Sequence, residues 1–358
     1  MKLIIILGTR PESIKFSPVI RECERLGLDF SVLHTGQHYS YNMDRVFFEQ
    51  LGLPEVGDNL NVGSGYHGEQ TGKILMGVER VLQREAPDVV LVLGDTNTVV
   101  AGALAAVKLG IKVGHVEAGL RSYDRSMPEE INRVVADHVS DYLFAPTEAS
   151  AGILKGEGIV ESKVFVVGNT IVDAVEQNLE LAKSAMLPEE IKVKRGKYLV
   201  ATAHRQENVD DKVRFNGILV GLRKAQKLFD LPLIYPIHPR ARKRLNEFKL
   251  NHDGLVLVEP FDYLAFLKLL SQARLVFTDS GGLQEECCIL KVPCVTLRDN
   301  TERPETLEVG SNKLAGTDPK RIVDAAQVMV KKRRVWVNPF GDGQSSKRIV
   351  EVLRQKLE

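Results

Sequence analysis

The sequence predicts a doubly wound α/β fold in two domains, and three observations support that prediction. Short runs of Val, Ile and Leu alternate with helical segments along the whole chain. These runs, such as Leu3–Leu7, are unbroken by polar residues, which is typical of strands covered by helices on both faces. At 358 residues the chain exceeds what one hydrophobic core normally supports. Repeated strand–helix–strand units form parallel sheets, so we expect two Rossmann-like domains.

The order of the predicted elements divides the chain near residue 170. In the first half the predicted strands are 2–7, 30–35, 88–93, 111–116 and 142–145. In the second half they are 164–167, 197–202, 232–236, 255–258, 274–278 and 293–297. Helical patterns cover 17–26, 71–85, 99–109, 129–139 and 216–228. We therefore predict an N-terminal domain of residues 1–170, joined by the C-terminal helix 345–358, and a C-terminal domain of residues 171–344.

Composition and charge exclude several classes of protein. The formal net charge is +1, so the chain lacks the basic surface expected of a protein that binds nucleic acid or an anionic membrane. No apolar run approaches the roughly 18 residues of a membrane span, and the first apolar run is too short for a secretory signal. The four cysteines show no CxxC pair and no metal-ligand spacing. We expect a cytoplasmic protein with reduced thiols and no bound metal.

The turn Ser280-Gly281-Gly282 is the strongest local signal for a ligand. It follows an apolar run and precedes a helix-forming run. A strand end, two glycines and a helix N-terminus together present backbone N–H groups and the positive end of the helix dipole, which suits a diphosphate. Glu285 and Glu286 lie one helical turn further on, where they could bond sugar hydroxyls. A helix cap with tolerated glycines is the alternative.

Polar and aromatic residues after other strands of the C-terminal domain extend this candidate site. Ligands of such sheets bind beyond the carboxyl ends of the strands, so residues at these positions are the candidates. His204 is a candidate for phosphate contact or proton donation, and a plain loop histidine is the alternative. Phe261 is a candidate to face a nucleobase, and Arg303 is a further phosphate candidate.

Two cations follow the first strand of the N-terminal domain. Arg10 and Lys15 lie near a helix start marked by Pro11. They favour anion binding, with ordinary surface charge as the alternative for either residue alone. No Gly-x-Gly-x-x-Gly motif opens a helix here or elsewhere, so the dinucleotide-binding fingerprint is missing.

Three carboxylates of the N-terminal half end strands or open a helix. Asp95 ends one strand, Glu117 ends the next, and Glu129 opens a helix behind a proline. Helix capping is the alternative for Asp95, and compensation of a helix dipole is the alternative for Glu129. Glu117 stands at the mouth of a buried strand, where a carboxylate without a partner or a task bears a desolvation cost. Together the three acids predict acid/base chemistry.

Ordered motifs along nearly the whole chain resemble the non-hydrolysing UDP-N-acetylglucosamine 2-epimerases, which have the two-domain GT-B fold. The matching motifs are Gly8-Thr9-Arg10-Pro11-Glu12, Thr35-Gly36-Gln37-His38, Gly94-Asp95-Thr96, His115-Val116-Glu117-Ala118-Gly119-Leu120-Arg121, Pro128-Glu129-Glu130-x-Asn132-Arg133, Thr202-x-His204-Arg205-x-Glu207-Asn208, Asp279-Ser280-Gly281-Gly282-x-Gln284-Glu285-Glu286 and Arg303-Pro304-Glu305. Their order and spacing are specific to this family rather than to GT-B glycosyltransferases at large. The resemblance implies a homodimer that binds UDP and interconverts UDP-GlcNAc and UDP-ManNAc.

The resemblance also implies roles for individual residues. The acid/base residues would be Asp95, Glu117 and Glu129, with His204 as a further catalytic candidate. The contacts to the UDP phosphates would be Arg10, Lys15, His204, Ser280, Gly281, Gly282 and Arg303. Phe261 would lie beside the uracil, and Glu286, with Glu285 as the weaker choice, would hold the ribose hydroxyls. Gln37 and His38 match a motif with which bacterial relatives bind a second, activating UDP-GlcNAc, but an arginine those enzymes use has no clear equivalent near residues 69–72.

The implied reaction needs no cofactor on chemical grounds. The C2 hydrogen of the sugar is barely acidic, because no carbonyl adjoins it. Expulsion of UDP across C1–C2 leaves a 2-acetamidoglucal, and re-addition of UDP with the proton on the other face inverts C2. Carboxylates can transfer the protons, while cations and a helix N-terminus stabilise the departing diphosphate. We therefore predict an isomerase that requires neither a nicotinamide cofactor nor a metal.

Three other functions stay open from the sequence. A GT-B glycosyltransferase would share the nucleotide site but would not obviously need the three acids. A hydrolysing epimerase that releases ManNAc and UDP differs only in whether water intercepts the intermediate. An inert UDP-sugar sensor would gain nothing from several buried acids.

Overall fold

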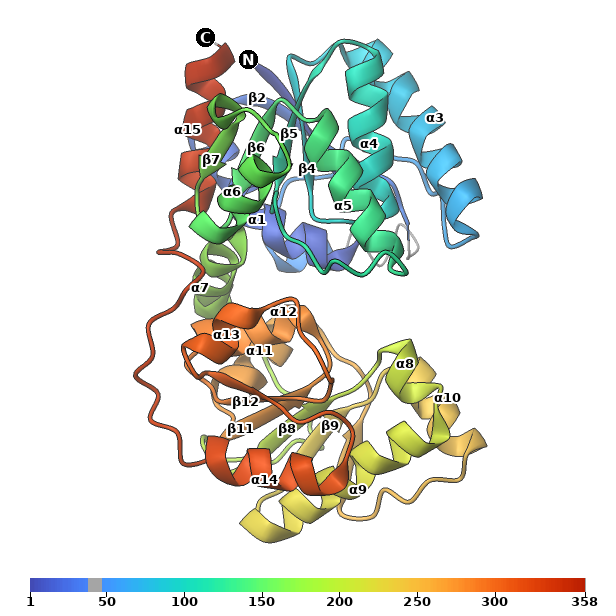
Figure 1. The fold of residues 1–358 in the computed structure, drawn as a ribbon, viewed down its shortest axis with the longest axis vertical. Coiled ribbons are helices and arrows are strands. Elements are labelled where there is room, and N and C mark those ends of the chain that lie inside the picture. Colours follow the sequence, from blue (N-terminus) through green and yellow to red (C-terminus); the bar gives the residue numbers. More distant parts are fainter. Residues whose placement is uncertain (38–46, 358) are drawn as a thin grey trace. The chain divides into compact units, whose positions relative to one another are not determined.

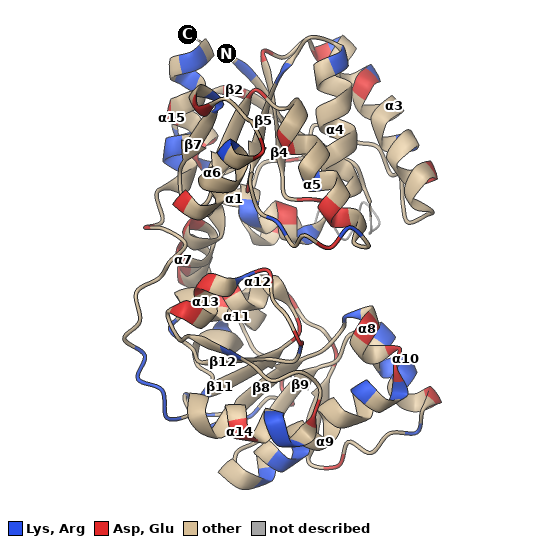
Figure 2. Ribbon diagram, in the orientation of Figure 1, with Lys and Arg blue, Asp and Glu red and all other residues tan. Residues whose placement is uncertain are grey.

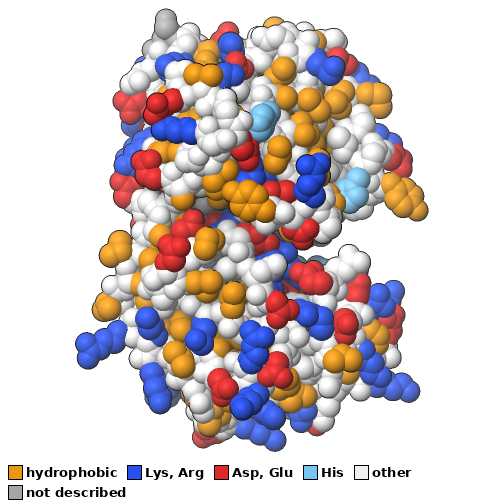
Figure 3. All heavy atoms as spheres, in the orientation of Figure 1, with side chains coloured by type: hydrophobic (Ala, Val, Ile, Leu, Met, Phe, Trp, Pro, Cys, Tyr) orange, Lys and Arg blue, Asp and Glu red, His pale blue; other side chains and the backbone are white. Residues whose placement is uncertain are grey.

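The computed structural model describes residues 1–37 and 47–357, which divide into two units (Figure 1). Unit 1 contains Met1–Gln177 and Phe340–Glu358, and unit 2 contains Asn178–Pro339. The chain leaves unit 1 inside helix α7 (Thr170–Ala182), whereas the sequence pattern put the change at the start of that helix. Acidic and basic residues are spread over the elements of both units (Figure 2). On the face in Figure 3 charged side chains of both signs lie between hydrophobic ones.

Unit 1 is built on a parallel sheet of seven strands among its described residues. The strands are β1 (Lys2–Leu7), β2 (Asp29–His34), β3 (Asp58–Asn59), β4 (Val89–Leu93), β5 (Lys112–Val116), β6 (Tyr142–Ala145) and β7 (Val164–Val166). Their order across the sheet is β3-β2-β1-β4-β5-β6-β7. The chain therefore winds outward from β1 in two directions.

Helices bury both faces of this sheet. In chain order they are α1 (Arg10–Arg25), α3 (His67–Glu85), α4 (Asn97–Lys108), α5 (Pro128–Val139), α6 (Glu148–Gly156), a 3-10 turn at Glu161–Lys163, the first part of α7, and α15 (Ser345–Leu357). On one face Ile4 and Ile6 pack into a cluster with α3 and α4. The alternate residues of β1, Leu3 and Ile5, are also fully buried. Burial on both faces is what the unbroken apolar runs predict.

Unit 2 repeats the architecture with six strands, again all parallel. The strands are β8 (Leu199–Thr202), β9 (Leu233–Pro236), β10 (Leu255–Val258), β11 (Leu275–Thr278), β12 (Cys294–Thr296) and β13 (Asn312–Leu314), in the order β10-β9-β8-β11-β12-β13. The helices are α8 (Gln206–Val209), α9 (Lys212–Phe229), α10 (Pro239–Glu247), α11 (Tyr263–Ser271), α12 (Gly281–Ile289), α13 (Pro304–Glu308) and α14 (Pro319–Met329).

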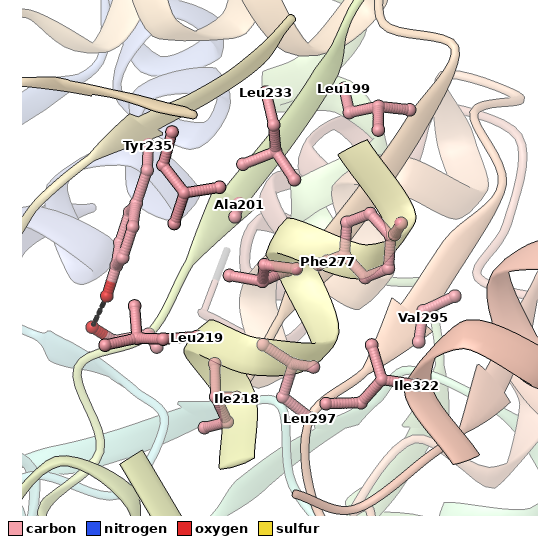
Figure 4. Close-up of a cluster of buried hydrophobic side chains, with 14 of the residues drawn as sticks. Leu199, Ala201, Ile218, Leu219, Leu233, Tyr235, Phe277, Val295, Leu297 and Ile322 are labelled. Carbon is pink, nitrogen blue, oxygen red and sulfur yellow. Dashed lines mark hydrogen bonds between the residues drawn. The ribbon is translucent and has the colours of Figure 1, made fainter. Parts of the chain in front are cut away.

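The main core of unit 2 lies between its sheet and helices α9 and α14. Figure 4 shows Phe277 of the sheet among side chains that include Ile218 of α9 and Ile322 of α14. The hydroxyl of Tyr235 donates to the carbonyl oxygen of Ala203 at 3.1 Å, which satisfies the one polar atom of that buried ring. On the opposite face Val276 and its neighbours pack against α11 and α12.

Helix starts are fixed by short-range hydrogen bonds. Thr9 and Glu12 form a capping box at the start of α1, and Pro11 occupies its first turn. This helix therefore begins at Arg10, earlier than the pattern at 17–26 predicts. Ser280 caps α12, since its hydroxyl accepts from the N–H of Leu283 at 3.4 Å.

The structure adds elements that the apolar pattern missed. Strands β3 and β13 are short, two and three residues, and lie at the outer edges of their sheets. Helices α6, α10, α11 and α14 are also additions. They span only 9 to 11 residues, too few turns for a clear helical period. Among the described residues, no helix is both long enough and apolar enough to cross a bilayer.

Candidate active site

Each sheet reverses its winding direction at one pair of neighbouring strands, and doubly wound folds bind ligands beyond the carboxyl ends of such a pair. In unit 1 the pair is β1 and β4, and in unit 2 it is β8 and β11. Arg10 and Asp95 follow the strands of the first pair, while His204 and Ser280 follow those of the second. Topology therefore gathers the candidates of each unit at one sheet edge.

Glu117 follows β5 with its backbone in the left-handed region, at φ +66°. For a residue with a side chain this conformation costs about 1–2 kcal/mol. Glu117 is 7% exposed, and its Oε1 accepts from Lys15 Nζ at 2.5 Å. A buried carboxylate, a strained backbone and a paired cation thus coincide at this sheet edge. Such strain is concentrated at functional sites.

Asp95 follows β4 but does not cap the next helix, because the N-cap of α4 is Thr96. The carboxylate of Asp95 is ion-paired with Arg133 of α5, and its carbonyl oxygen accepts from Asn132 Nδ2 at 2.9 Å. Helix α5 therefore fixes both the side chain and the backbone of Asp95. Nothing local in the sequence links position 95 to position 133, so Arg133 was not among the predicted site residues.

The two adjacent acids at the start of α5 have different environments. Glu129 is exposed, whereas Glu130 is only 4% exposed. Glu130 accepts from the N–H groups of Ser122 and Tyr123, at 2.9 and 3.0 Å, and pairs with Arg133. Burial opposes ionisation of Glu130, but the bonds from Ser122 and Tyr123 and the charge of Arg133 outweigh it and lower its pKa. Glu130 therefore anchors the preceding loop, and Glu129 is the acid left facing solvent.

Glu12 is a buried acid at the same edge, and the sequence pattern predicts no role for it. Its Oε2 accepts from the N–H groups of Gly8 and Thr9, at 2.7 and 2.8 Å, and Oε1 contacts the hydroxyl of Thr96 at 2.5 Å. Burial raises the pKa of Glu12 to about 7, although these hydrogen bonds act in the opposite direction. Glu12 thus joins the loops after β1 and β4.

The remaining candidates of unit 1 lie near this edge. The Arg10 guanidinium is 5.6 Å from the centre of the Phe47 ring. Gln37 is buried, and its Oε1 accepts from the N–H and hydroxyl of Thr98 at 3.2 and 2.7 Å. Its side-chain oxygen is therefore used inside unit 1, and its part in a second site stays a prediction. His38 lies outside the described residues.

In unit 2 the first two residues of α12, Gly281 and Gly282, leave space that no other part of the fold fills. A Cβ at Gly281 would lie 3.7 Å from its nearest neighbour, Glu302 Oε2, and one at Gly282 would lie 4.0 Å from Ser280 Oγ. Neither glycine adopts a positive φ. Packing and backbone conformation would accept alanine here, so the room at this helix N-terminus is available to a ligand.

Asp279, at the end of β11, organises the loop after β8. It is fully buried and accepts from the N–H groups of His204 and Arg205, each at 3.0 Å, and from Asn208 Nδ2 at 3.2 Å. The Nδ1 atom of His204 lies 3.0 Å from the same carboxylate. Burial opposes ionisation of Asp279, but these bonds and the His204 charge outweigh it and lower its pKa. Asp279 therefore fixes the half-exposed His204 beside the start of α12.

Arg303 is held by acids of unit 2. Its Nε donates to Oε1 of the fully buried Glu285 at 2.5 Å, and its Nη1 donates to the carbonyl oxygen of Glu302 at 3.0 Å. The Glu302 carboxylate in turn pairs with Arg298 at 2.7 Å. Glu285 is thus placed to orient Arg303, which leaves Glu286 as the better candidate for the ribose.

The predicted nucleoside contacts lie on or next to α11 and α12. Glu286 is 6% exposed, and its Oε1 accepts from the Tyr263 hydroxyl at 3.4 Å. Phe261, half buried, packs edge-on against Phe266 with the ring centres 6.1 Å apart. An aromatic ring supported from behind in this way can offer its other face to a base.

Comparison with known proteins connects these sites to one family. The family model described as UDP-N-acetylglucosamine 2-epimerase matches residues 21–354. A UDP-N-acetylglucosamine 2-epimerase of Methanocaldococcus jannaschii is 56% identical to this chain over 99% of both sequences. A UDP-2,3-diacetamido-2,3-dideoxy-D-glucuronate 2-epimerase of Pseudomonas aeruginosa is 42% identical over 99% of both.

A solved structure extends the likeness to three dimensions. The UDP-GlcNAc 2-epimerase of M. jannaschii, crystallised in complex with UDP-GlcNAc and UDP, superposes with a TM-score of 0.91 at 55% identity, covering 99% of this chain and 100% of that one. The predicted fold class, two Rossmann-like parallel sheets of the GT-B type, is confirmed. With both the sequence and the fold matched over nearly their full length, this chain belongs to the UDP-N-acetylglucosamine 2-epimerase family.

Proposed function

We propose that this protein is an isomerase that interconverts UDP-GlcNAc and UDP-ManNAc by inverting C2 of the sugar. The observation that carries the proposal is Glu117, a buried carboxylate held in a strained backbone and paired with Lys15 at the switch-point edge of unit 1. A site that only binds a nucleotide has no need of a buried carboxylate in a strained backbone. Membership of the epimerase family gives the reaction class.

Unit 1 supplies the proton transfers in this proposal. One of the carboxylates Asp95, Glu117 and Glu129 removes the C2 proton on one face of the sugar, and an acid on the other face returns one. Positioned acids and bases of this kind contribute about 10²–10⁴-fold to a rate. Asp95 and Glu117 are each ion-paired, with Arg133 and Lys15, so their geometry is set before substrate arrives. The exposed Glu129 is the third candidate.

Unit 2 supplies most of the contacts to UDP in this proposal. The N–H groups of Gly281 and Gly282 bind the diphosphate at the N-terminus of α12, with His204, Ser280 and Arg303 as polar and cationic contacts. Arg10 and Lys15 of unit 1 are the remaining candidates for the phosphates. Phe261 faces the uracil and Glu286 bonds the ribose. Donors fixed in advance at a developing negative charge stabilise it without reorganising, which is the main help an enzyme can give a departing diphosphate.

The chemistry balances without an oxidant. The C2–H bond and the C1–O bond to the diphosphate break, a C1=C2 double bond forms, and UDP leaves with its electron pair. Re-addition reverses each step with the proton on the opposite face of C2. Within residues 1–37 and 47–357, no group of three or more His, Cys, Asp or Glu is arranged to hold a metal ion. Independence of nicotinamide and metal stays a prediction, which full activity after EDTA dialysis and charcoal treatment would support.

Isotope incorporation tests the proposal. The protein is incubated in deuterated water with UDP-GlcNAc, and in parallel with UDP-2,3-diacetamido-2,3-dideoxy-D-glucuronate, the sugar named for the P. aeruginosa relative. We expect UDP-ManNAc with deuterium at C2 from the first substrate and little turnover of the second. Free ManNAc would instead establish a hydrolysing epimerase, and turnover of the second sugar alone would reassign the substrate.

Two features implied by the resemblance belong to the same proposal. We expect a homodimer, which light scattering on the purified protein measures. We also expect Gln37 and His38 to bind a second, activating UDP-GlcNAc. A rate curve from pure UDP-ManNAc without a lag would contradict that second site.

A further inference from the structure

His115, near the end of β5, is fully buried and hydrogen-bonded at both ring nitrogens. Its Nδ1 lies 2.7 Å from Asp137 Oδ1, and its Nε2 lies 2.8 Å from the carbonyl oxygen of Gly94. A carbonyl oxygen can only accept, so Nε2 carries a proton. If Asp137 is ionised, it also can only accept, and Nδ1 must carry a proton too.

The surroundings of Asp137 establish that it is ionised. Its second oxygen, Oδ2, lies 2.7 Å from Arg121 Nη1 and accepts from the N–H of Gly119 at 3.1 Å. Arginine is always charged in proteins, and it pairs here with a carboxylate that is almost completely buried. Both His115 bonds therefore require an imidazolium, since a neutral ring has one N–H only.

Charged groups near His115 come from several elements. Asp137 faces it from α5, Glu117 follows the end of its strand, and Arg121 lies beyond Asp137. Lys15 of α1 is paired with Glu117, and Glu157 after α6 is paired with Arg121. Burial opposes the charge of His115, but the charge of Asp137 and the two hydrogen bonds outweigh it and raise the pKa of the ring.

This imidazolium joins the backbone segments that carry two of the candidate acids. Through Nε2 it holds the carbonyl oxygen of Gly94, the residue immediately before Asp95. Through Nδ1 it orients Asp137, whose other oxygen holds the N–H of Gly119. Gly119 lies two residues after Glu117, in the turn where Glu117 has its left-handed backbone. One ring thus fixes two loops that are far apart in the chain.

We propose that His115 is a positioning residue that is protonated at neutral pH and keeps Asp95 and Glu117 in place for proton transfer. The inference rests on the proposed function, because it assigns the two acids to the reaction. The protonation state itself is independent of that function. His115 touches no reacting atom and acts through the backbone of its neighbours.

Nuclear magnetic resonance of the wild-type protein tests the protonation state. The protein is labelled with ¹⁵N at histidine, and the signal of His115 is assigned by its loss in His115→Gln. We expect both ring nitrogens to carry a proton at pH 7, where an exposed histidine with a pKa of about 6.5 is mostly neutral. A neutral tautomer of His115 at pH 7 would overturn the proposal, whatever the protein catalyses.

Kinetics of His115→Gln test the positioning role. Glutamine can keep a donor toward Gly94 but carries no charge, so both loops lose part of their support. We expect kcat to fall on the order of 10²-fold, as small misplacements of catalytic groups do, with KM and UDP affinity unchanged. His138→Gln is the matched control, since His138 is an exposed residue of α5 and should retain full activity. An unchanged kcat in His115→Gln would overturn the positioning role.

A second variant, Asp137→Asn, separates positioning from simple loss of fold. Without the carboxylate, burial is left to lower the pKa of His115, so the ring should be neutral across the neutral pH range. We expect the ¹⁵N spectrum of this variant to show a proton on one ring nitrogen only, and kcat to fall about as far as in His115→Gln, with UDP binding retained. A neutral ring together with a wild-type kcat would contradict the role of the charge. The ¹⁵N measurement on wild type still decides if this variant does not fold.

Discussion

The acids that follow the central strands of the two sheets have different partners. In unit 1 the buried Glu117 is paired with Lys15, and the partly exposed Asp95 is paired with Arg133. In unit 2 the central acid, Asp279, is held mainly by backbone N–H groups and Asn208, and its task is to shape a loop. According to the proposed function, the first arrangement positions carboxylates for proton transfer, and the second shapes a loop that contacts the diphosphate.

The glycines of the two edges differ in the same way. A Cβ at Gly8 of unit 1 would lie 2.1 Å from Thr35 Oγ1 and 2.3 Å from Thr98 Oγ1, so packing within the chain excludes a side chain. At Gly281 of unit 2 the nearest atom to a Cβ would be 3.7 Å away. The fold of unit 1 therefore requires glycine at position 8. In unit 2, according to the proposed function, it is the ligand that requires glycine at position 281.

The largest effect should come from Glu117→Gln, which removes an acid/base group and keeps its size. We expect kcat to fall by about 10²–10⁴-fold without weaker UDP binding, because the amide keeps the size of the side chain and releases Lys15, a proposed phosphate contact, from its ion pair. Steady-state kinetics and calorimetric UDP titration measure the two effects. Glu148→Gln, at an exposed position of α6, is the control. A variant that loses UDP binding and kcat together would break the contrast between the units.

Glu12→Gln should change how stability depends on pH. The pKa of Glu12 is about 7 in the folded protein against 4.5 in a free chain, so between these values the folded state holds a proton that the unfolded state has released. The free energy of unfolding that Glu12 contributes therefore falls as pH rises through this window, by roughly 3 kcal/mol in all. Glutamine has no proton to lose and can keep the same contacts.

Urea denaturation of wild type and Glu12→Gln from pH 4.5 to 8 measures this difference. The variant should match wild type near pH 4.5 and become progressively more stable than wild type up to about pH 7. A difference that stays constant with pH would mean that Glu12 is ionised throughout and that its hydrogen bonds, not its burial, control it.

Asp279→Asn should have its main effect on unit 2. The amide cannot accept from two backbone N–H groups, Asn208 and His204 as the carboxylate does, and a lost hydrogen bond to a charged group costs about 1.5–3 kcal/mol. We expect lower stability in denaturant and weaker UDP binding, because the His204 loop loosens. With UDP-GlcNAc saturating, kcat should also fall, because His204 is one of the groups proposed to stabilise the departing diphosphate. Asp253→Asn, in an exposed loop, controls for charge alone. UDP binding equal to that of wild type would contradict a role of this loop in holding the diphosphate.

The sharpest test compares two glycine variants, one of which should have the smallest effect on stability. Gly281→Ala should leave the fold unchanged or stabilise it by up to about 1 kcal/mol, since alanine favours helix, yet it should weaken UDP binding. Gly8→Ala should destabilise the fold by about 1–3 kcal/mol through overpacking. Thermal melting with and without UDP measures both. If UDP stabilises Gly281→Ala as much as wild type, the diphosphate does not bind at the start of α12.

Sequence patterns could predict the fold because strands of a parallel sheet are locally recognisable. The run at 142–145 and the run at 255–258 match β6 and β10 residue for residue. The candidate site residues could then be predicted as well, because they follow the strands and the carboxyl ends of parallel strands share one edge of the sheet. Short elements such as β13 and α10 were missed because so few residues carry no clear period, and their pairing partners lie elsewhere in the chain.

Site details depended on partners that no local pattern reveals. The adjacent acids Glu129 and Glu130 look alike in the sequence, and only the loop at Ser122 decides which one is buried. Asp95 has the residue type of a helix cap, yet Arg133 takes its carboxylate and Thr96 takes the cap position.

By itself, then, the sequence determined the two parallel α/β sheets and the set of polar residues at the ends of their strands, because side-chain periodicity and helix-start residues act over a few positions. Only the tertiary structure decided which of those residues are buried, which are ion-paired and which have a strained backbone. Lys15 and Glu117 are 102 positions apart, and His115 and Asp137 are 22 apart. Ionisation in a buried site is set by the charges and hydrogen bonds that folding brings within a few ångströms, and those partners come from distant parts of the chain.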